Sequence, residues 1–287
     1  MKFTKMQGTG NDFVMIRPEK TDDDWAQLAI KMCDRRFGIG ADGIILALPS
    51  DKASIRMRIF NSDGSEAETC GNGLRCLSKY CVVNGLVKAR SPEIMIDTIP
   101  GVRRIKLTYA DETITQIQVG IGIPKFAAKE IPILVESVKN QVDNSKPILD
   151  YPLTIDGNLL GLSFVSMGNP HAVNFINQKV RDYPLLEIGP KVEHNPMFPK
   201  RVNFEVARVI DRSNIEMRVW ERGAGETLAC GTGACAVAVA ARLHDYIDNK
   251  VDIKLPGGTL NIEWDGKGEV LMSGPAEIVF TGEWLQD

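Results

Sequence analysis

Two segments of the chain, 160 residues apart, follow the same plan, and this repeat limits the possible folds more than any other feature. Residues 54–73 and 214–233 align without a gap and share seven identities in twenty positions. Ordinary composition would give roughly one identity by chance. The identical pairs are Ile55/Ile215, Met57/Met217, Arg58/Arg218, Glu66/Glu226, Cys70/Cys230, Gly71/Gly231 and Gly73/Gly233. The repeat predicts two similar domains, each of which supplies one Cys-Gly-x-Gly sequence.

The length of the chain agrees with two domains. At 287 residues it suits two domains of about 140 residues, each large enough for its own core. We expect residues 1–117 and 275–287 to form the first domain, because the last segment crosses back to it, and residues 118–274 to form the second. Residues 125–150 are rich in Lys, Glu, Pro and Asn, which predicts a peripheral connection.

Composition and charge restrict the class of partner. The chain is 44% apolar and 25% charged, as in soluble globular proteins. A net charge of -3 provides no basic field for nucleic acid or for an anionic membrane. The N-terminus lacks the apolar core of a targeting signal, and no run approaches the 18 apolar residues of a membrane span. We therefore expect a cytoplasmic protein whose partners are small molecules or proteins.

Each repeat predicts a strand, a loop and a helix that begins at the cysteine. Residues 55–60 alternate between apolar and polar side chains, as strands do, and residues 215–220 are expected to be the neighbour of a strand at 200–210. The helix after Cys70 has apolar residues at helical spacing and should end at Asn84-Gly85. The segment after Cys230 is Ala-rich and apolar nearly all round, which is typical of a buried helix.

The chain has six cysteines, at positions 33, 70, 76, 81, 230 and 235. In a reducing compartment, free thiols, metal ligands or catalysts are expected more often than disulfides. Cys33 lies on the apolar face of a helix that follows residues 21–24, while Cys81 and Cys235 lie on buried helix faces, so we expect these three to be packing residues. The helical spacing leaves Cys76 undecided.

The remaining cysteines, Cys70 and Cys230, stand where a helix can change their chemistry. The positive end of the helix dipole stabilises a thiolate, so their pKa should fall below the free value of about 8.5. Glycine amides after each cysteine can point at an anion such as a carboxylate. If the two units face each other across one small molecule, one thiolate can remove a proton and the opposite thiol can supply another, which inverts a stereocentre.

Two Gly-Asn turns occupy matching places in the two halves. Asn11 follows Gly10 between two predicted strands, and Asn169 follows Gly168 at the end of another, with His171 just beyond. The glycine-rich loop at 38–43 lacks the third glycine and the following helix that a dinucleotide site requires.

Together these motifs resemble those of the diaminopimelate epimerases, over nearly the whole chain. The motifs are Gly10-Asn-Asp-Phe13, Phe60-Asn-Ser-Asp-Gly-Ser65, Cys70-Gly-Asn-Gly73, Met167-Gly-Asn-Pro-His171 and Glu221-Arg-Gly-Ala-Gly-Glu-Thr-Leu-Ala-Cys-Gly-Thr-Gly233. The resemblance implies an α/β (α+β) fold of two pseudo-symmetric domains, each a curved mixed β-sheet wrapped around a central α-helix. It implies a homodimeric isomerase that converts LL-diaminopimelate to the meso form without a cofactor or a metal, in lysine and peptidoglycan precursor biosynthesis.

By matching position, the resemblance also implies roles for individual residues. Cys70 and Cys230 are the expected catalytic bases, and His171 and Glu221 are the pair expected to adjust the pKa of the thiols. The expected substrate-binding residues are Asn11, Asn61, Gly71, Asn72, Asn169, Asn203, Glu221, Arg222, Gly231 and Thr232. The chemistry agrees, because a second amino acid centre needs a cation such as Arg222 for its carboxylate and acceptors such as Glu221 for its ammonium group.

Two positions depart from the family pattern. Gln7 stands where His is common, and Gly43 stands where many members have a substrate-contacting Gln. The first half therefore lacks the amide that Asn203 supplies in the second. His194 and His244 receive no role.

Three alternatives remain open from the sequence. A related two-thiol racemase could act on proline or hydroxyproline, although Arg222 and the asparagines argue against a substrate with a single charged centre. A structural zinc protein would use Cys70, Cys76, Cys81 and Cys230. A redox-sensing protein would join Cys70 and Cys230 in a disulfide. For Glu221 and Arg222 the simplest alternative to a substrate site is a surface ion pair.

Overall fold

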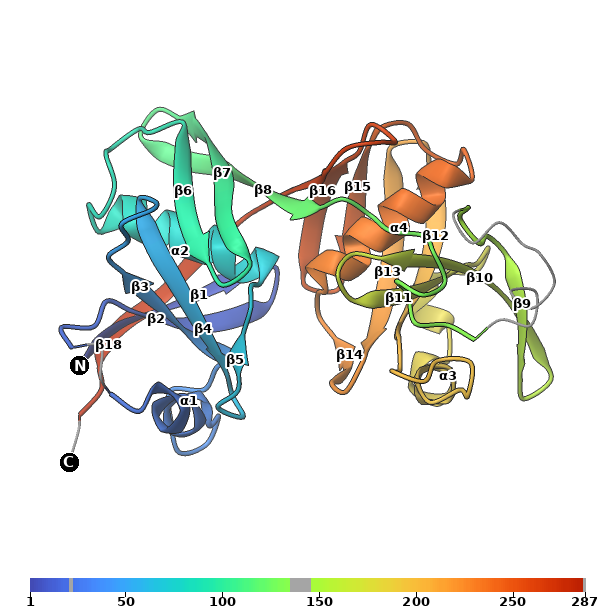
Figure 1. The fold of residues 1–287 in the computed structure, drawn as a ribbon, viewed down its shortest axis with the longest axis horizontal. Coiled ribbons are helices and arrows are strands. Elements are labelled where there is room, and N and C mark those ends of the chain that lie inside the picture. Colours follow the sequence, from blue (N-terminus) through green and yellow to red (C-terminus); the bar gives the residue numbers. More distant parts are fainter. Residues whose placement is uncertain (21–22, 135–145, 286–287) are drawn as a thin grey trace. The chain divides into compact units, whose positions relative to one another are not determined.

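The computed structural model describes residues 1–20, 23–134 and 146–285 (Figure 1). The chain divides into two compact units, Met1–Gly120 with Ser273–Asp287, and Ile121–Met272. Each unit contains a mixed β-sheet and a central helix, so the predicted α/β class with two similar halves is confirmed.

The first unit is built on one mixed sheet. Its strands are β1 (Lys2–Gly8), β2 (Asn11–Ile16), β3 (Gly43–Leu48), β4 (Ile55–Asn61), β5 (Glu66–Ala67), β6 (Glu93–Thr98), β7 (Gly101–Ala110), β8 (Thr113–Gly122) and β18 (Glu277–Glu283). Strand β1 pairs antiparallel with both β18 and β2, whereas β2–β3 and β4–β6 are parallel pairs. The helices are α1 (Trp25–Cys33) and α2 (Gly71–Val83).

The second unit repeats this pairing scheme. Its strands are β9 (Tyr151–Ile155), β10 (Asn158–Ser166), β11 (Pro170–Phe175), β12 (Asn203–Asp211), β13 (Asn214–Glu221), β14 (Gly225–Thr227), β15 (Lys250–Leu255) and β16 (Gly258–Glu263), and β17 (Val270–Gly274) follows. Strand β10 pairs antiparallel with β9 and β11, and β11–β12 and β13–β15 are parallel. The helices are the 3-10 turn η2 (Val180–Asp182), α3 (Leu185–Glu193) and α4 (Gly231–Leu243).

The predicted helices form where the sequence places them. In α1 the Asp24 carboxylate caps the helix by accepting from the Gln27 amide, and Cys33 is buried. Residues 21 and 22 of the predicted helix start lie outside the described residues. Helix α2 ends at Asn84, and Gly85 follows with φ +64°, a conformation that glycine adopts without strain.

Helix α4 forms the core of the second unit. All residues from Gly233 to Ala241 are buried, and the helix packs against β10, β11, β12, β15 and β16 (Figure 1). The Ala-rich sequence permits this close approach on all sides, which confirms the predicted buried helix. Cys235 is fully buried in this core, as predicted.

The prediction that residues 125–150 form a peripheral connection is wrong for their described N-terminal part. Lys125 forms an isolated β-bridge with Ser166. Ala128, Ile131 and Ile133 are buried in the same apolar cluster as residues of β10 and β12. Residues 135–145 lie outside the described residues.

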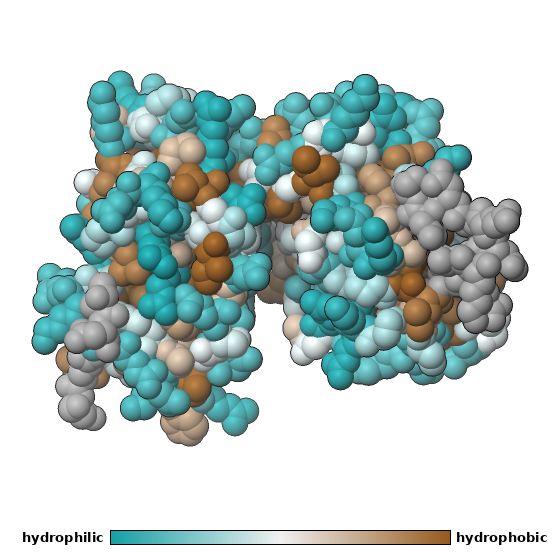
Figure 2. All heavy atoms as spheres, in the orientation of Figure 1, coloured by the Kyte–Doolittle hydropathy of each residue, from teal (hydrophilic) through white to brown (hydrophobic). Residues whose placement is uncertain are grey.

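The face of each unit seen in Figure 2 is mainly hydrophilic, with apolar side chains in small separate groups. Within the described part of the chain, no helix has the length and apolarity needed to cross a membrane.

Candidate active site

The repeated segments fold into the same arrangement in the two units. In each, a strand and a short second strand form a hairpin, β4–β5 and β13–β14, and a 13-residue helix follows. Cys70 and Cys230 are the N-cap residues of these helices, both in extended backbone conformation. Because the first amides of a helix have no partner within the helix, both thiols lie beside donors that can receive an anion.

In the first unit, Cys70 lies beside two predicted substrate contacts. Its sulfur is 3.7 Å from Asn11 Oδ1, and Asn72 Nδ2 donates to the same oxygen at 3.4 Å. The Asn11 amide nitrogen donates to Asp42 Oδ2 at 2.5 Å. Asp42 therefore fixes the Asn11 amide with its oxygen toward the thiol, and Gly10, with φ +86°, makes the turn that places it there.

A partly exposed cluster of charged residues lies next to this turn and supports it. Asp12, next to Asn11, pairs with Lys5 at 2.7 Å and receives two hydrogen bonds from Arg35, at 2.9 and 3.1 Å. Burial raises the pKa of Asp12, but the hydrogen bonds from Arg35 and Lys5 outweigh it and lower that pKa to about 2. Asp12, Asp42 and Arg35 are not among the site residues predicted from the sequence, although Asp42 lies in the glycine-rich loop at 38–43.

In the second unit, four polar groups form a chain of hydrogen bonds that ends at Cys230. Thr232 Oγ1 lies 3.5 Å from Cys230 Sγ and accepts from Asn169 Nδ2 at 3.2 Å. The Asn169 oxygen lies 2.9 Å from His171 Nε2, and His171 Nδ1 lies 2.7 Å from Glu205 Oε1. His171 and Glu205 are both fully buried.

The pKa of Cys230 was expected to be lowered by the helix terminus, but its surroundings raise it. Burial, followed by the nearby carboxylates of Glu221 and Glu205, raises the pKa of Cys230 well above its usual range. Hydrogen bonds from Thr232 and from the Gly233 amide act in the opposite direction without reversing it. Removal of the sulfur from water therefore outweighs the helix terminus at this thiol.

His171 and Glu221, the two residues expected to adjust the pKa of the thiols, have different neighbours. The carboxylate that contacts the His171 ring is that of Glu205, which was not among the predicted site residues. Glu221 instead accepts from the Thr227 hydroxyl at 2.5 Å and acts on Cys230 through its charge. Burial raises the pKa of Glu205, and the neighbouring His171 partly offsets this effect.

Asn203 and Arg222 lie together, at the start of β12 and after β13. The Asn203 side chain donates to Pro170 O and accepts from the Arg222 backbone amide, both at 2.9 Å. The Arg222 guanidinium is exposed and donates to Lys200 O at 3.2 Å. The buried Glu193, which the sequence analysis missed, holds this loop by accepting from Gly223 N at 2.9 Å.

The remaining predicted substrate contacts lie at helix starts or in the hairpin turn. Gly71 and Gly231 are the first residues of α2 and α4. Asn61 is exposed at the end of β4, where its amide donates to Ser65 Oγ at 2.9 Å. At Gly43, where many family members have a substrate-contacting Gln, an added Cβ would meet the Phe60 carbonyl oxygen at 2.6 Å.

The other cysteines, Cys33, Cys76, Cys81 and Cys235, are buried. Burial raises the pKa of Cys33, Cys76 and Cys81 to about 12, which makes these thiols poor nucleophiles near neutral pH. Cys76, which the sequence left undecided, belongs to this group. Across residues 1–20, 23–134 and 146–285, no three His, Cys, Asp or Glu side chains are grouped as a metal ion would require.

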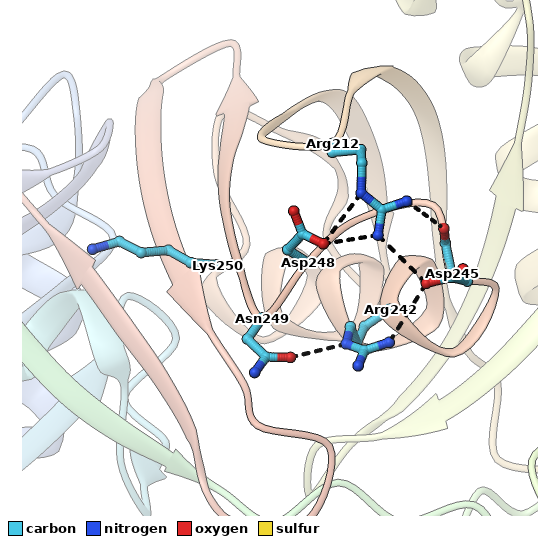
Figure 3. A pocket seen from close by; sticks show the side chains of 6 residues that line it. All are labelled: Arg212, Arg242, Asp245, Asp248, Asn249 and Lys250. Carbon is cyan, nitrogen blue, oxygen red and sulfur yellow. Dashed lines mark hydrogen bonds and ion pairs between the residues drawn. The ribbon is translucent and has the colours of Figure 1, made fainter.

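A surface hollow of about 400 Å³ in the second unit contains none of the predicted site residues. Figure 3 shows its cations joined to neighbouring groups: Arg212 binds Asp248 at 2.8 Å, Arg242 binds Asn249 at 3.0 Å, and Lys250 points away from them. The two arginines of the hollow are thus already bound to neighbouring groups of the protein, whereas Cys70 and Cys230 lie at the two helix starts.

Comparisons with known proteins identify the family of this chain. A model of the family "Diaminopimelate epimerase" matches residues 3–127 and 163–279. The diaminopimelate epimerase of Acetivibrio thermocellus is 46% identical over 286 residues, covering 99% of this chain and 98% of that protein.

Two solved structures share the fold at low sequence identity. A Bacillus anthracis phenazine biosynthesis protein of the PhzF family has a TM-score of 0.71 at 17% identity and covers 100% of this chain and 99% of its own. A probable proline racemase from Agrobacterium radiobacter has a TM-score of 0.69 at 13% identity, with coverages of 100% and 93%. The family match and the identity to the Acetivibrio enzyme are far more specific, and the chain belongs to the diaminopimelate epimerase family.

Proposed function

We propose that the protein is an isomerase that converts LL-diaminopimelate to meso-diaminopimelate with two cysteines as acid and base and with no cofactor. The observation that supports this mechanism best is the repeated placement of a cysteine as the N-cap residue of a 13-residue helix. A product of this kind would serve lysine and peptidoglycan precursor biosynthesis.

In the proposed reaction, the thiolate of one cysteine takes the α-proton of the substrate. The electron pair of the broken C–H bond moves toward the α-carboxylate, and the thiol of the other cysteine delivers its proton to the opposite face of the carbon. The first sulfur ends as a thiol and the second as a thiolate, so the first must lose a proton to solvent and the second must gain one before the next conversion in the same direction. Cys70 and Cys230 are assigned to these two positions.

Stabilisation of the carboxylate is the main energetic demand on this site. The α-proton of an amino acid is weakly acidic, so the charge that develops on the carboxylate must be met by fixed donors. The amides of Gly71, Asn72, Gly231 and Thr232, at the starts of α2 and α4, are assigned to this role. Asn11 and Asn169 complete the contacts beside the two thiols.

The unreacting end of the substrate carries a second carboxylate and ammonium group. The exposed guanidinium of Arg222 suits the carboxylate, and Glu221, Asn61 and Asn203 offer oxygens to the ammonium group. His171 and Glu221 are assigned to adjusting the pKa of the thiols. His171 would act through Asn169, and Glu221 through its charge. The alternative substrates proline and hydroxyproline have no second charged centre for Arg222 to bind.

The proposal extends to the organisation of the protein. Residues 1–117 with 275–287 and residues 118–274 are taken as the two epimerase domains, with one thiol each. We place the protein in the cytoplasm as a homodimer, with a small-molecule substrate and without nucleic acid or membrane partners.

Incubation of the reduced protein with LL-diaminopimelate in deuterated water tests the function. The meso product should appear with deuterium at one α-carbon, whereas Cys70→Ala and Cys230→Ala should each remove epimerisation and Cys33→Ala should retain it. Parallel incubations with L-proline and trans-4-hydroxy-L-proline should show no isomerisation. Turnover of either imino acid, or no exchange with diaminopimelate, would contradict the proposal.

A further inference from the structure

The buried pair of His171 and Glu205 lowers the stability of the protein, and the fold does not require a polar pair at these two positions. Both side chains are fully buried, and Glu205 Oε2 has no hydrogen-bond partner among the described residues. A buried carboxylate with an unpaired oxygen destabilises a protein relative to an apolar side chain of similar size. The pair therefore needs an explanation other than stability.

The first unit shows the same framework with apolar residues in these places. By the offset of the repeat, Glu205 on β12 corresponds to Ile45 on β3, and by the two Gly-Asn turns His171 corresponds to Phe13. An added Cβ at Gly233 would meet Glu205 Oε1 at 2.8 Å, and one at Gly73 would meet Ile45 Cδ1 at the same distance. The two pairs thus occupy equivalent places. Phe13 and Ile45 are also buried, but their side chains are entirely apolar.

The hydrogen bonds of His171 and Glu205 determine which group donates and which accepts at each step of the hydrogen-bond series from Glu205 to Cys230. The Asn169 amide donates to Thr232, so its oxygen must accept, and His171 Nε2 must carry a hydrogen. His171 Nδ1 and Glu205 Oε1 then share one further proton, as an ion pair or as a neutral acid and imidazole. In both forms the pair has no net charge and Nε2 keeps its hydrogen.

The Thr232 hydroxyl connects this series of hydrogen bonds to the Cys230 thiol. Because its oxygen already accepts from Asn169, its hydrogen is available for Cys230 Sγ, 3.5 Å away. The Gly233 amide donates to the same sulfur, while the carboxylates of Glu221 on β13 and Glu205 on β12 oppose a negative charge there. From His171 to Thr232, each side chain of the series therefore donates a hydrogen bond to the next group on the way to the Cys230 sulfur.

We propose that Glu205 is a positioning residue that, through His171 and Asn169, holds the Thr232 hydroxyl as a donor to Cys230 and so favours its thiolate. This inference rests on the proposed function only for its purpose, since the chain of hydrogen bonds can be tested on the thiol itself. A simple charge effect predicts the opposite sign, because removal of a nearby carboxylate would by itself favour the thiolate.

The test is the pH dependence of iodoacetamide labelling of the reduced full-length protein, followed by peptide mapping of Cys230 and Cys70. Glu205→Ile introduces the residue of the first unit, and Thr232→Val removes the last donor. Each should shift the Cys230 labelling profile upward by about one pH unit, a roughly tenfold lower rate at fixed pH. The double variant should shift no further than either single one, because both remove the same hydrogen bond.

Glu205→Gln provides the conservative control. Its amide can donate to His171 Nδ1, which keeps the hydrogen on Nε2, so its Cys230 profile should match that of the wild type. The Cys70 profile should be the same in all variants. If Glu205→Ile alone does not fold, the double variant His171→Phe/Glu205→Ile reproduces the apolar pair of the first unit and should show the same upward shift.

A downward or absent shift in the Ile variants, a Gln variant that behaves like Ile, or additive effects with Thr232→Val would overturn the inference. These outcomes are independent of turnover. A protein that does not act on diaminopimelate can still show the predicted labelling, and an active epimerase can fail to show it, so the two proposals fail separately.

Discussion

Arg218 holds Glu226 across β13 and β14 through two hydrogen bonds, of 2.7 Å from Nε and 3.0 Å from Nη2. In the first unit Arg58 holds Glu66 across β4 and β5 with the same two distances. The repeated Arg and Glu identities thus have a shared structural role: they close the hairpin that leads to each N-cap cysteine.

The two pairs should differ in their contribution to stability. The Arg218 side chain is 16% exposed and also donates to Val180 O and Tyr183 O, whereas that of Arg58 is 30% exposed. Arg218→Ala would leave partly buried carbonyls unpaired and should lower the free energy of unfolding by about 2–3 kcal/mol. Arg58→Ala should cost less than about 1 kcal/mol. Urea denaturation of both variants checks the order, and equal losses would contradict it.

Asp12 should make stability depend on pH in the acid range. Its pKa in the folded protein is about 2, below the usual 3.8, so its ion pairs stabilise the folded state fully above 3.8 and the contribution disappears as the pH falls through 2. The shift corresponds to about 2 kcal/mol at pH 7. In Asp12→Asn, the loss relative to the wild type should shrink by about 1 kcal/mol between pH 7 and pH 3.

Urea denaturation at several pH values measures this difference, and Asp51→Asn at an exposed position is the matched control. A difference between wild type and Asp12→Asn that stays constant down to pH 3 would show that the carboxylate has an ordinary pKa.

Gly43 should resist replacement by the glutamine that the family pattern suggests. An added Cβ lies 2.6 Å from the Phe60 backbone oxygen, so β3 and β4 would have to separate. Gly43→Ala and Gly43→Gln should each lower the free energy of unfolding by about 1–3 kcal/mol. Gly161→Ala, whose nearest contact is 3.4 Å from a side-chain oxygen, should change it by less than about 0.5 kcal/mol. A stable Gly43→Gln variant with a lower KM would show instead that the position is a vacant substrate contact.

The elements around the two cysteines could be predicted because their signals are local. The spacing of apolar residues after Cys70 and the stop at Asn84-Gly85 specify α2, and the alanines after Cys230 specify α4. Helix α3 was missed because it is short and contains Pro190, which ordinarily interrupts a helix. The burial of Ile131 was missed because composition averages over the charged neighbours that surround it.

The predicted residues also identify part of each thiol's surroundings, namely Asn11 and Asn72 beside Cys70, and Asn169 and Thr232 beside Cys230. The carboxylates that orient them could not be paired from the sequence, because a pairing across strands depends on register. One signal was present: Glu205 is a charged residue within the apolar stretch of a predicted strand, where an inward-facing acid needs a partner.

Strand β18 has a consequence for the order in which the protein forms during synthesis. It supplies the outer neighbour of β1, pairing Lys2 with Glu283, so the sheet that β1 begins is completed by a strand that is translated only after the whole of residues 121–272. Residues 121–272 are continuous and can form their unit while the chain is still growing. The half that is translated first is therefore the half that finishes last, and until then β1 exposes an unpaired edge to other chains.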